Sequence, residues 1–425
     1  MGIKSRLIVM NFLQFFVWGA WLITVGNYWF ITKNWDGAGF GAVFSTLGFA
    51  SIIMPPLTGI IADRRVNAER LYGILHILGG VALACIPLVN DPGTFFRVIF
   101  AAMLCYMPTL SLSNSVAYHI LVSNRMDVVK VFPPIRVWGT IGFIAGMWVT
   151  NLTGNKASAN QFLIAAAAAV ALGCYSFSLP KCPPLKSTVR NAPIVELLGL
   201  SAFRLFGNYK TALFLVFSMF LGGALQLTNM YGDVFISDFA TLPEFKDSPV
   251  VKYSTIILSI SQVSETLFIL AIPFFLKRFG IKTVMLLSMC AWVLRFALFA
   301  YGDPAAGLWM IILSCVVYGM AFDFFNISGS LFVEQQGDPR IRASAQGLFM
   351  LMTNGIGAVV GSLVAGYAID LWYTAADGSK DWQGIWTAFA LYALAMTVAF
   401  VLLFKHRHER PRVVPEHGPA DVNNP

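Results

Sequence analysis

The chain has 425 residues, of which 57% are hydrophobic and 12% are charged, and its mean hydropathy is +0.70. Soluble domains carry about 25% charged residues, so this composition excludes an ordinary soluble protein and indicates a chain that crosses a membrane many times. The net charge of +8 does not indicate nucleic-acid binding, because the basic residues form no basic–aromatic motif and no basic domain.

Twelve apolar stretches are long enough to cross a bilayer, since a helical span needs about 20 mostly apolar residues. The first stretch follows a short basic start, as in a signal peptide, but it lacks a small-residue cleavage site and is interpreted as the first span. In chain order, the expected spans are residues 7–31, 39–61, 71–90, 95–121, 130–151, 161–179, 211–235, 253–275, 283–301, 307–333, 344–371 and 385–404.

The longest gap between expected spans, residues 180–210, divides them into six and six. We therefore expect an all-α membrane protein with twelve transmembrane helices in two six-helix bundles, the major facilitator fold. The expected units are an N-terminal bundle (1–180), a cytoplasmic linker (181–210), a C-terminal bundle (211–404) and a cytoplasmic tail (405–425).

Lysine and arginine are distributed unevenly between the expected loops. If the N-terminus is inside, 21 of the 29 basic residues lie on the inner side, five lie outside and three lie within or at the edge of spans. The positive-inside rule then places both termini in the cytoplasm.

Enzyme and metal motifs are missing from the sequence. The six cysteines have no metal-ligand spacing and suggest no disulfide framework, and the chain contains no phosphate-binding loop, HExxH motif or nucleophile elbow. We expect neither catalysis nor a metal, and the missing nucleotide-binding loop also argues against direct coupling to ATP.

Charged side chains interrupt four of the apolar stretches: Glu265, Asp323, Arg136 and Arg295. An ionised side chain at the centre of a bilayer costs about 2.5–3.5 kcal/mol on insertion scales. A chain that keeps such groups usually uses them to handle a solute, an ion or a proton.

Polar and aromatic side chains repeat at helical spacing on one face of four expected spans. The positions are Arg136, Thr140 and Phe143; Gln226 and Asn229; Gln262 and Glu265; and Tyr318 and Phe322 with the adjoining Asp323. Intramembrane polar groups face a bundle interior or an aqueous cavity. Converged on a cavity, this set suits a nucleoside, whose base stacks on aromatic rings and pairs with amides, and whose ribose hydroxyls donate to a carboxylate.

Simpler interpretations of the same residues stay open at this point. The amides could join helices, the phenylalanines Phe143 and Phe322 could be packing residues, and either acid could be a structural partner of Arg136 or Arg295. Arg295 could pair with an acid or help to position one.

The loop GIIADRRVNAER (Gly59 to Arg70) resembles the loop signature of major facilitator transporters, a glycine followed by aspartate and basic residues. Asp63 can cap a neighbouring helix N-terminus and pair with arginines across the boundary between bundles. We expect Asp63 and Arg64 to act in gating, although an ordinary charged turn would have the same composition.

Longer motifs carry a family resemblance: FPPIRVWGTIGF (Phe132 to Phe143), ISQVSETLFILAIPFF (Ile260 to Phe275), AFDFFNISGSLFVE (Ala321 to Glu334), CYMPTLSL and IRASAQG. From end to end, the chain resembles the bacterial nucleoside:proton symporters of the major facilitator superfamily. The resemblance implies import of purine and pyrimidine nucleosides with protons across the bacterial inner membrane. It implies alternating access, a central cargo cavity between the bundles, no cofactor and, as a further expectation, a monomer.

The resemblance also implies roles for individual residues. Cargo would be bound by Arg136, Thr140 and Phe143 of the PPIRxWGTIGF motif, Gln226 and Asn229 of LQxTN, Gln262 and Glu265 of SQxSE, and Tyr318, Phe322 and Asp323 of YGxAFDF. The two acids, Glu265 and Asp323, would couple cargo to protons.

Three other functions remain as alternatives. A proton symporter for sugars would use the same pairing of carboxylates and arginine with fewer aromatic rings and amides, so the amide count favours nucleosides. A permease with narrow specificity for one purine nucleoside, such as xanthosine, would be hard to distinguish from a broad one. A receptor that does not transport, or a membrane enzyme, would need a soluble signalling domain or a catalytic motif, and the sequence indicates neither.

Overall fold

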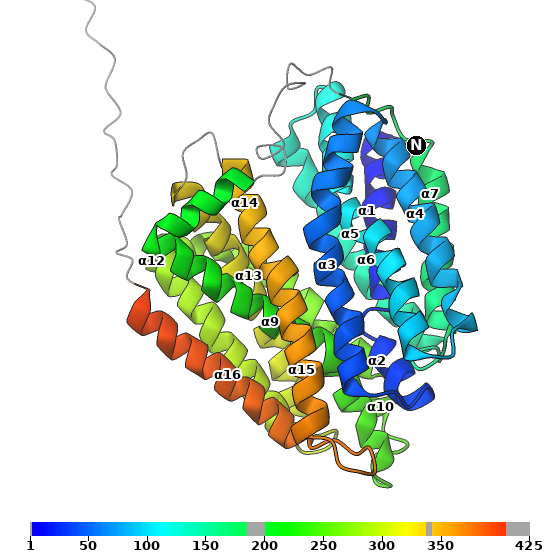
Figure 1. The fold of residues 1–425 in the computed structure, drawn as a ribbon, viewed down its shortest axis with the longest axis vertical. Helices are drawn as coiled ribbons and strands as arrows, with labels where there is room; N and C mark the ends of the chain where they lie inside the picture. The colour runs from blue at the N-terminus through cyan, green and yellow to red at the C-terminus, as the bar shows by residue number, and fades with distance from the viewer. Residues whose placement is uncertain (1, 185–199, 337–341, 405–425) are drawn as a thin grey trace, which may run out of the picture.

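The computed structural model describes residues 2–184, 200–336 and 342–404. Throughout these ranges the regular structure is helical, apart from one isolated bridge between Thr374 and Lys380 (Figure 1). The expected all-α class is therefore observed. Half of the predicted linker (185–199 of 181–210) and the predicted tail (405–425) lie outside the described residues.

The longer helices make up most of the described chain. In chain order they are α1 (Ile3–Gly19), α3 (Gly37–Arg64), α4 (Ala68–Ala84), α5 (Pro92–Ser123), α6 (Val128–Leu152), α7 (Asn160–Ser176), α9 (Tyr209–Asp238), α12 (Ile260–Tyr301), α13 (Leu308–Gln336), α14 (Arg342–Met350), α15 (Ala358–Trp372) and α16 (Trp382–Leu403). The shorter elements are α2 (Val25–Asn27), η1 (Tyr28–Thr32), η2 (Ile86–Leu88), η4 (Leu200–Gly207), η5 (Phe239–Thr241), α10 (Pro249–Lys252), α11 (Ser254–Leu258) and η7 (Leu351–Gly357).

Within the described ranges, eight helical segments are long and apolar enough to cross a membrane. One of them, Ser254–Tyr301, covers two expected spans, 253–275 and 283–301. The backbone of α12 breaks between these spans at Gly280, whose φ of 76° lies in the left-handed region that glycine adopts most easily. The total of twelve spans stays a prediction.

The first expected span, 7–31, is not one continuous helix. Helix α1 ends at Gly19, and the chain then turns through Leu22 and Ile23 into α2 and η1. Side chains of other helices form hydrogen bonds with the polar groups of this turn. Thr150 donates to the carbonyl of Ala20 at 2.7 Å, and Thr24 donates to Gln161 at 2.8 Å. These partners permit an interruption at membrane depth, because backbone groups there need partners within the protein.

Helices of residues 3–176 pack mainly on one another, as do those of residues 209–403, and Figure 1 draws the two sets next to each other. Helix α1 packs on α6 and α4 on α7, while α12 packs on α13 and α16. The main helix contact between the sets is that of α3 with α15. The backbone N–H groups of Gly37 and Ala38, at the start of α3, donate to the two carboxylate oxygens of Asp370 at 2.7 and 2.6 Å. This contact places a carboxylate on the positive end of the helix dipole.

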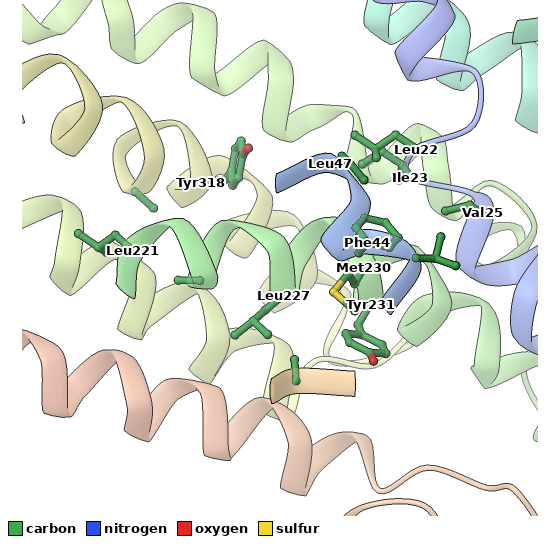
Figure 2. Close-up of a cluster of buried hydrophobic side chains, with 14 of the residues drawn as sticks. Leu22, Ile23, Val25, Phe44, Leu47, Leu221, Leu227, Met230, Tyr231 and Tyr318 are labelled. Atoms are coloured by element: carbon green, nitrogen blue, oxygen red, sulfur yellow. The ribbon is translucent and has the colours of Figure 1, made fainter. Parts of the chain in front are cut away.

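The hydrophobic core runs without interruption from one set of helices to the other. Figure 2 shows part of this cluster, with Phe44 and Leu47 from α3, Met230 and Tyr231 from α9, and Tyr318 from α13. Tyr231 also meets Phe40 of α3, with ring centroids 5.7 Å apart. Apolar side chains therefore join the two sets beside the helix faces that carry the expected cargo residues.

Helix α6 lies unusually close to α1 because glycine occupies the contact. A Cβ atom at Gly142 would lie 2.0 Å from the backbone oxygen of Phe12, and a Cβ at Gly19 would lie 2.1 Å from that of Phe143. This approach holds the α6 face that carries Arg136 and Phe143 against α1.

The α1–α6 contact leads to a stability prediction. We expect Gly142→Ala to destabilise the protein by about 1–3 kcal/mol, because a backbone atom of α1 must move to admit the methyl group. The matched control is Gly59→Ala on α3, where a Cβ would meet nothing within 4 Å, so the added alanine should be neutral or slightly stabilising. Thermal unfolding of both variants in detergent tests this, and equal melting temperatures would contradict it.

Candidate functional site

Three of the expected cargo residues lie half-buried on α6, on the side that meets α1. The Arg136 guanidinium stacks over the ring of Phe15 at 4.1 Å, and Phe143 meets Trp18 edge to face with ring centroids 6.4 Å apart. Thr140 lies one turn from Arg136 and is also half-buried. Helix α1 therefore supports this face with aromatic rings.

Helices α9 and α12 contribute the expected amides and one acid. Gln226 is buried and Asn229 half-buried on α9, while Gln262 and Glu265 are half-buried on α12. The side-chain oxygens of Gln226 and Gln262 are themselves buried, and no described group donates a hydrogen bond to them. Both amides thus keep an acceptor without a protein partner.

Helix α13 contributes two rings and the second acid. Tyr318 and Phe322 stack with their planes 9° apart and their centroids 6.2 Å apart. Asp323 is only 4% exposed, and its Oδ2 atom has no hydrogen-bond partner among the described residues. Gly319 lets α12 come close, since a Cβ there would lie 2.7 Å from the backbone nitrogen of Glu265.

Charges connect these helices into one site. The Arg136 cation on α6 and the Glu265 carboxylate on α12 attract each other, which links the two sets of helices. Glu265 and Asp323 repel each other, and Tyr318 interacts electrostatically with both. The structure therefore brings Arg136, Glu265, Tyr318 and Asp323 together.

The other expected residues lie on these helices or on a helix that packs against them. Helix α9, with Gln226 and Asn229, packs against α13, and Gln262 precedes Glu265 by one turn of α12. Thr140 and Phe143 share a face of α6 with Arg136. Phe143 and Phe322 also pack against the hydrophobic core, so these two rings are partly core residues.

Another buried glutamine shows what a purely structural amide looks like in this protein. Gln14 of α1 accepts from the hydroxyl of Tyr72 at 2.6 Å, lies 2.8 Å from the Nε2 atom of His76, and donates to Thr109 at 2.9 Å. An unpaired buried acceptor costs about 1–3 kcal/mol, so structural amides are normally satisfied in this way. The oxygens of Gln226 and Gln262 lack such partners among the described residues, as do the side-chain oxygens of Asn11, Asn27 and Asn151.

A second polar cluster joins the two sets of helices at the end opposite the N-terminus, where Figure 1 draws α2 and α10. Its centre is Asp233 of α9, which is 0% exposed. The Asn27 amide donates to one carboxylate oxygen of Asp233, and the Thr255 hydroxyl donates to the other at 3.0 Å. We call these three residues and the nearby Lys156 and Ser254 the Asp233 network.

Lys156, in the loop between α6 and α7, contributes further hydrogen bonds to the Asp233 network. Its ammonium group donates to the carbonyl of Val251 at 2.6 Å and to the Ser254 hydroxyl at 2.9 Å. Burial lowers the pKa of Lys156, and the nearby Asp233 carboxylate opposes that shift. Trp148 and Asn151 of α6 add hydrogen bonds to Ser259 and to the Lys252 carbonyl.

Sequence reasoning missed two of these contributors. Asp233 is not among the expected site residues, although it is a further acid within an expected span (211–235). Trp18 was not assigned to the site, and only its contact with Phe143 relates it to cargo. The expected gating residues Asp63 and Arg64 end α3, but their side chains lie outside the described part of the structure.

Comparisons with known proteins show which family the chain resembles. The family model for the nucleoside H+ symporter matches residues 1–409. The chain is 51% identical to the xanthosine permease of Escherichia coli (strain K12) over 414 residues, which is 97% of this chain and 98% of the relative. It is 49% identical to the nucleoside permease NupG of the same organism over 411 residues, 96% of this chain and 98% of that one.

A crystal structure of the nucleoside transporter NupG, 49% identical in sequence, superposes on the chain with a TM-score of 0.90, covering 96% of this chain and all of the other. The family resemblance found in the sequence motifs is thus confirmed, and the protein is a multi-pass membrane transporter rather than an enzyme. The chain belongs to the nucleoside H+ symporter family.

Proposed function

We propose that this symporter binds purine and pyrimidine nucleosides between α6, α9, α12 and α13, and that it imports them with protons by alternating access. The observation that carries the proposal is the set of buried acceptors without a protein partner, on Gln226, Gln262 and Asp323. They lie beside a cation and stacked aromatic rings that come from both sets of helices. Such a site offers acceptors to a neutral ligand rich in N–H and O–H groups.

Each part of a nucleoside has a complementary group in this site. The parallel rings of Tyr318 and Phe322, together with Phe143, offer stacking surfaces for the base, worth about 1–3 kcal/mol per base. The amides of Gln226, Asn229 and Gln262 can pair with base edges. Vicinal ribose hydroxyls are donors, and the Glu265 carboxylate can accept two of them at once. Arg136 and Thr140 complete the polar lining on α6.

Asp323 is the acid that we assign to proton transfer. Arg136 attracts Glu265 and balances its charge, whereas Asp323 has Glu265 as a like-charged neighbour and an oxygen without a partner. Two neighbouring carboxylates cannot both remain ionised easily in a site with little water. A proton on Asp323 removes that repulsion, so cargo and proton stabilise the same loaded state.

The Asp233 network would be the closed outer gate of the alternating-access cycle. It joins the two sets of helices at one end of the molecule, and the distribution of basic residues places the loops at that end outside the cell. The gating residues Asp63 and Arg64 would act at the cytoplasmic end. Opening the outer gate would break these buried hydrogen bonds, and outside water would then hydrate the freed polar groups.

The remaining architecture follows the sequence expectations. We propose twelve spans in two six-helix bundles, residues 1–180 and 211–404, with a cytoplasmic linker (181–210) and tail (405–425). Both termini would lie in the cytoplasm of a bacterial cell, with the chain in the inner membrane. The proton gradient alone would drive the transporter, without a cofactor, and it would work as a monomer.

The direct test is uridine uptake into proteoliposomes with an imposed inward proton gradient, with and without a protonophore. We expect accumulation that collapses with protonophore, and competition by both adenosine and xanthosine. Competition by xanthosine alone would favour a narrow purine permease. The absence of nucleoside uptake by proteoliposomes that contain folded protein and hold the proton gradient would contradict the proposal.

Asp323→Asn should abolish proton-driven accumulation of uridine, because the amide keeps the shape of the carboxyl group but carries no exchangeable charge. Exchange of labelled uridine without a gradient should persist, which separates coupling from folding. The matched control is Asp377→Asn in an exposed loop, where the carboxylate accepts only from Ser379. Wild-type accumulation by the Asp323 variant would remove this residue from the coupling mechanism.

Phe143→Ala should weaken uridine binding by roughly 5- to 150-fold, the equivalent of the 1–3 kcal/mol expected for one stacking surface. Binding to the purified protein can be followed by calorimetry. Phe177→Ala is the control, since Phe177 is an exposed residue at the end of α7. An unchanged affinity would show that Phe143 serves packing alone.

Asp233→Asn should weaken the outer gate, because one of its two oxygen acceptors becomes a donor facing Asn27 or Thr255. We expect roughly tenfold faster labelling of a cysteine introduced at the buried Leu227, by a thiol reagent that does not cross the membrane. The control is Asp238→Asn on the same helix, whose carboxylate accepts from Trp382 within the C-terminal helices. If both variants label at the wild-type rate, Asp233 does not hold the gate.

A further inference from the structure

Arg295, on the part of α12 that follows the break at Gly280, is only 1% exposed. Its guanidinium donates to the carbonyl of Ser314 at 2.7 Å and to the hydroxyl of Thr228 at 3.4 Å. It also stacks over the ring of Tyr318 at 4.6 Å and over that of Phe299 at 5.0 Å. One side chain therefore touches α9, α12 and α13.

No carboxylate forms a salt bridge with Arg295 in the part of the chain that the structure describes. The charge is balanced by the carbonyl oxygen, the hydroxyl and the two aromatic faces, the kind of environment that a planar guanidinium accepts more readily than an ammonium group. A buried cation with such partners is costly in a membrane, and intramembrane charges are generally functional. An apolar side chain would suffice if this position only filled space.

The partners of Arg295 adjoin the cargo site on two helices. Tyr318 stacks on Phe322 on one side, meets Trp292 edge to face, and interacts with the carboxylates of Glu265 and Asp323. Thr228 immediately precedes Asn229, and Ser314 lies one turn before Tyr318. The hydroxyl of Ser314 donates in return to the carbonyl of Arg295 at 3.0 Å, so α12 and α13 are locked in register at this level.

We propose that Arg295 is a positioning residue of the cargo site: held by Thr228 and the Ser314 carbonyl, it fixes the ring of Tyr318, so that Tyr318 and the stacked Phe322 meet the nucleoside in one geometry. The inference rests on the proposed binding site. Lysine cannot replace the arginine, because an ammonium group has no flat face for Tyr318 and no fork to reach Thr228 and the Ser314 carbonyl together.

The test is a double-mutant cycle on uridine affinity with Arg295→Lys, Tyr318→Leu and the double variant, each checked for melting temperature. We expect each single substitution to weaken uridine binding about tenfold, and the double variant to bind within about twofold of Tyr318→Leu alone, because Arg295 acts through the ring that is already gone. Arg295→Lys should also raise the KM for uridine uptake while the maximal rate stays within about twofold.

Control variants separate positioning from general stability. Arg278→Lys changes an exposed arginine that also lies over a ring, that of Phe279 at 5.6 Å, and should leave uridine affinity unchanged. If Arg295→Lys does not fold, Thr228→Val keeps the cation but removes one of its partners. It should weaken uridine binding in the wild-type background and have no effect in the Tyr318→Leu background.

Two outcomes would overturn the inference in different ways. If the losses of Arg295→Lys and Tyr318→Leu multiply in the double variant, or if Arg295→Lys lowers only the maximal rate, Arg295 does not act through Tyr318, while the proposed cargo site stands. If Tyr318→Leu binds uridine like the wild type, Tyr318 is not part of that site and the inference fails with it.

Discussion

Charged groups inside a membrane need partners from other helices, and in this protein these pairings determine which helices meet. Arg136 of α6 attracts Glu265 of α12, Asn27 donates to Asp233 of α9, and Arg295 holds α9, α12 and α13 together. Each pairing joins segments that are far apart along the chain. In hydrocarbon the alternative to each pairing is an unsatisfied charge or dipole, so these few contacts restrict the arrangement of the whole molecule.

Glycine makes the pairings geometrically possible. The backbone of α1 touches α6 at Gly142, and α13 approaches the Ser264–Glu265 backbone at Gly319. A larger residue at either position would separate helices whose side chains must reach a common ligand. Small residues at helix contacts are the usual solution in membranes, where packing and polar contacts replace the hydrophobic effect as the source of helix association.

The proposed cargo site and the Asp233 network differ in how completely their carboxylates are satisfied. Both oxygens of Asp233 accept hydrogen bonds from the protein, whereas Asp323, Gln226 and Gln262 keep buried acceptors without a protein partner. A satisfied network holds one conformation, and an unsatisfied one gains when a ligand arrives. The two clusters thus have the complementary properties that a gate and a binding site require.

The sequence alone predicted the helical class, most of the spans, the family and the helix faces that carry the proposed cargo residues. These properties depend on local hydropathy, on helical spacing and on long motifs. Each of these signals lies within a short stretch of the sequence. The faces that carry Arg136, Glu265 and Asp323 could be predicted because each residue stands alone within an apolar run.

Only the tertiary structure decided the interruption of α1 after Gly19, the Asp233 network and the environment of Arg295. Thr150 and Gln161 satisfy the turn after α1, and Asn27 and Lys156 reach helices that follow them by about 100 residues or more. Such partners leave no periodic signal, because hydrogen bonds between distant helices depend on three-dimensional packing and not on spacing along the chain.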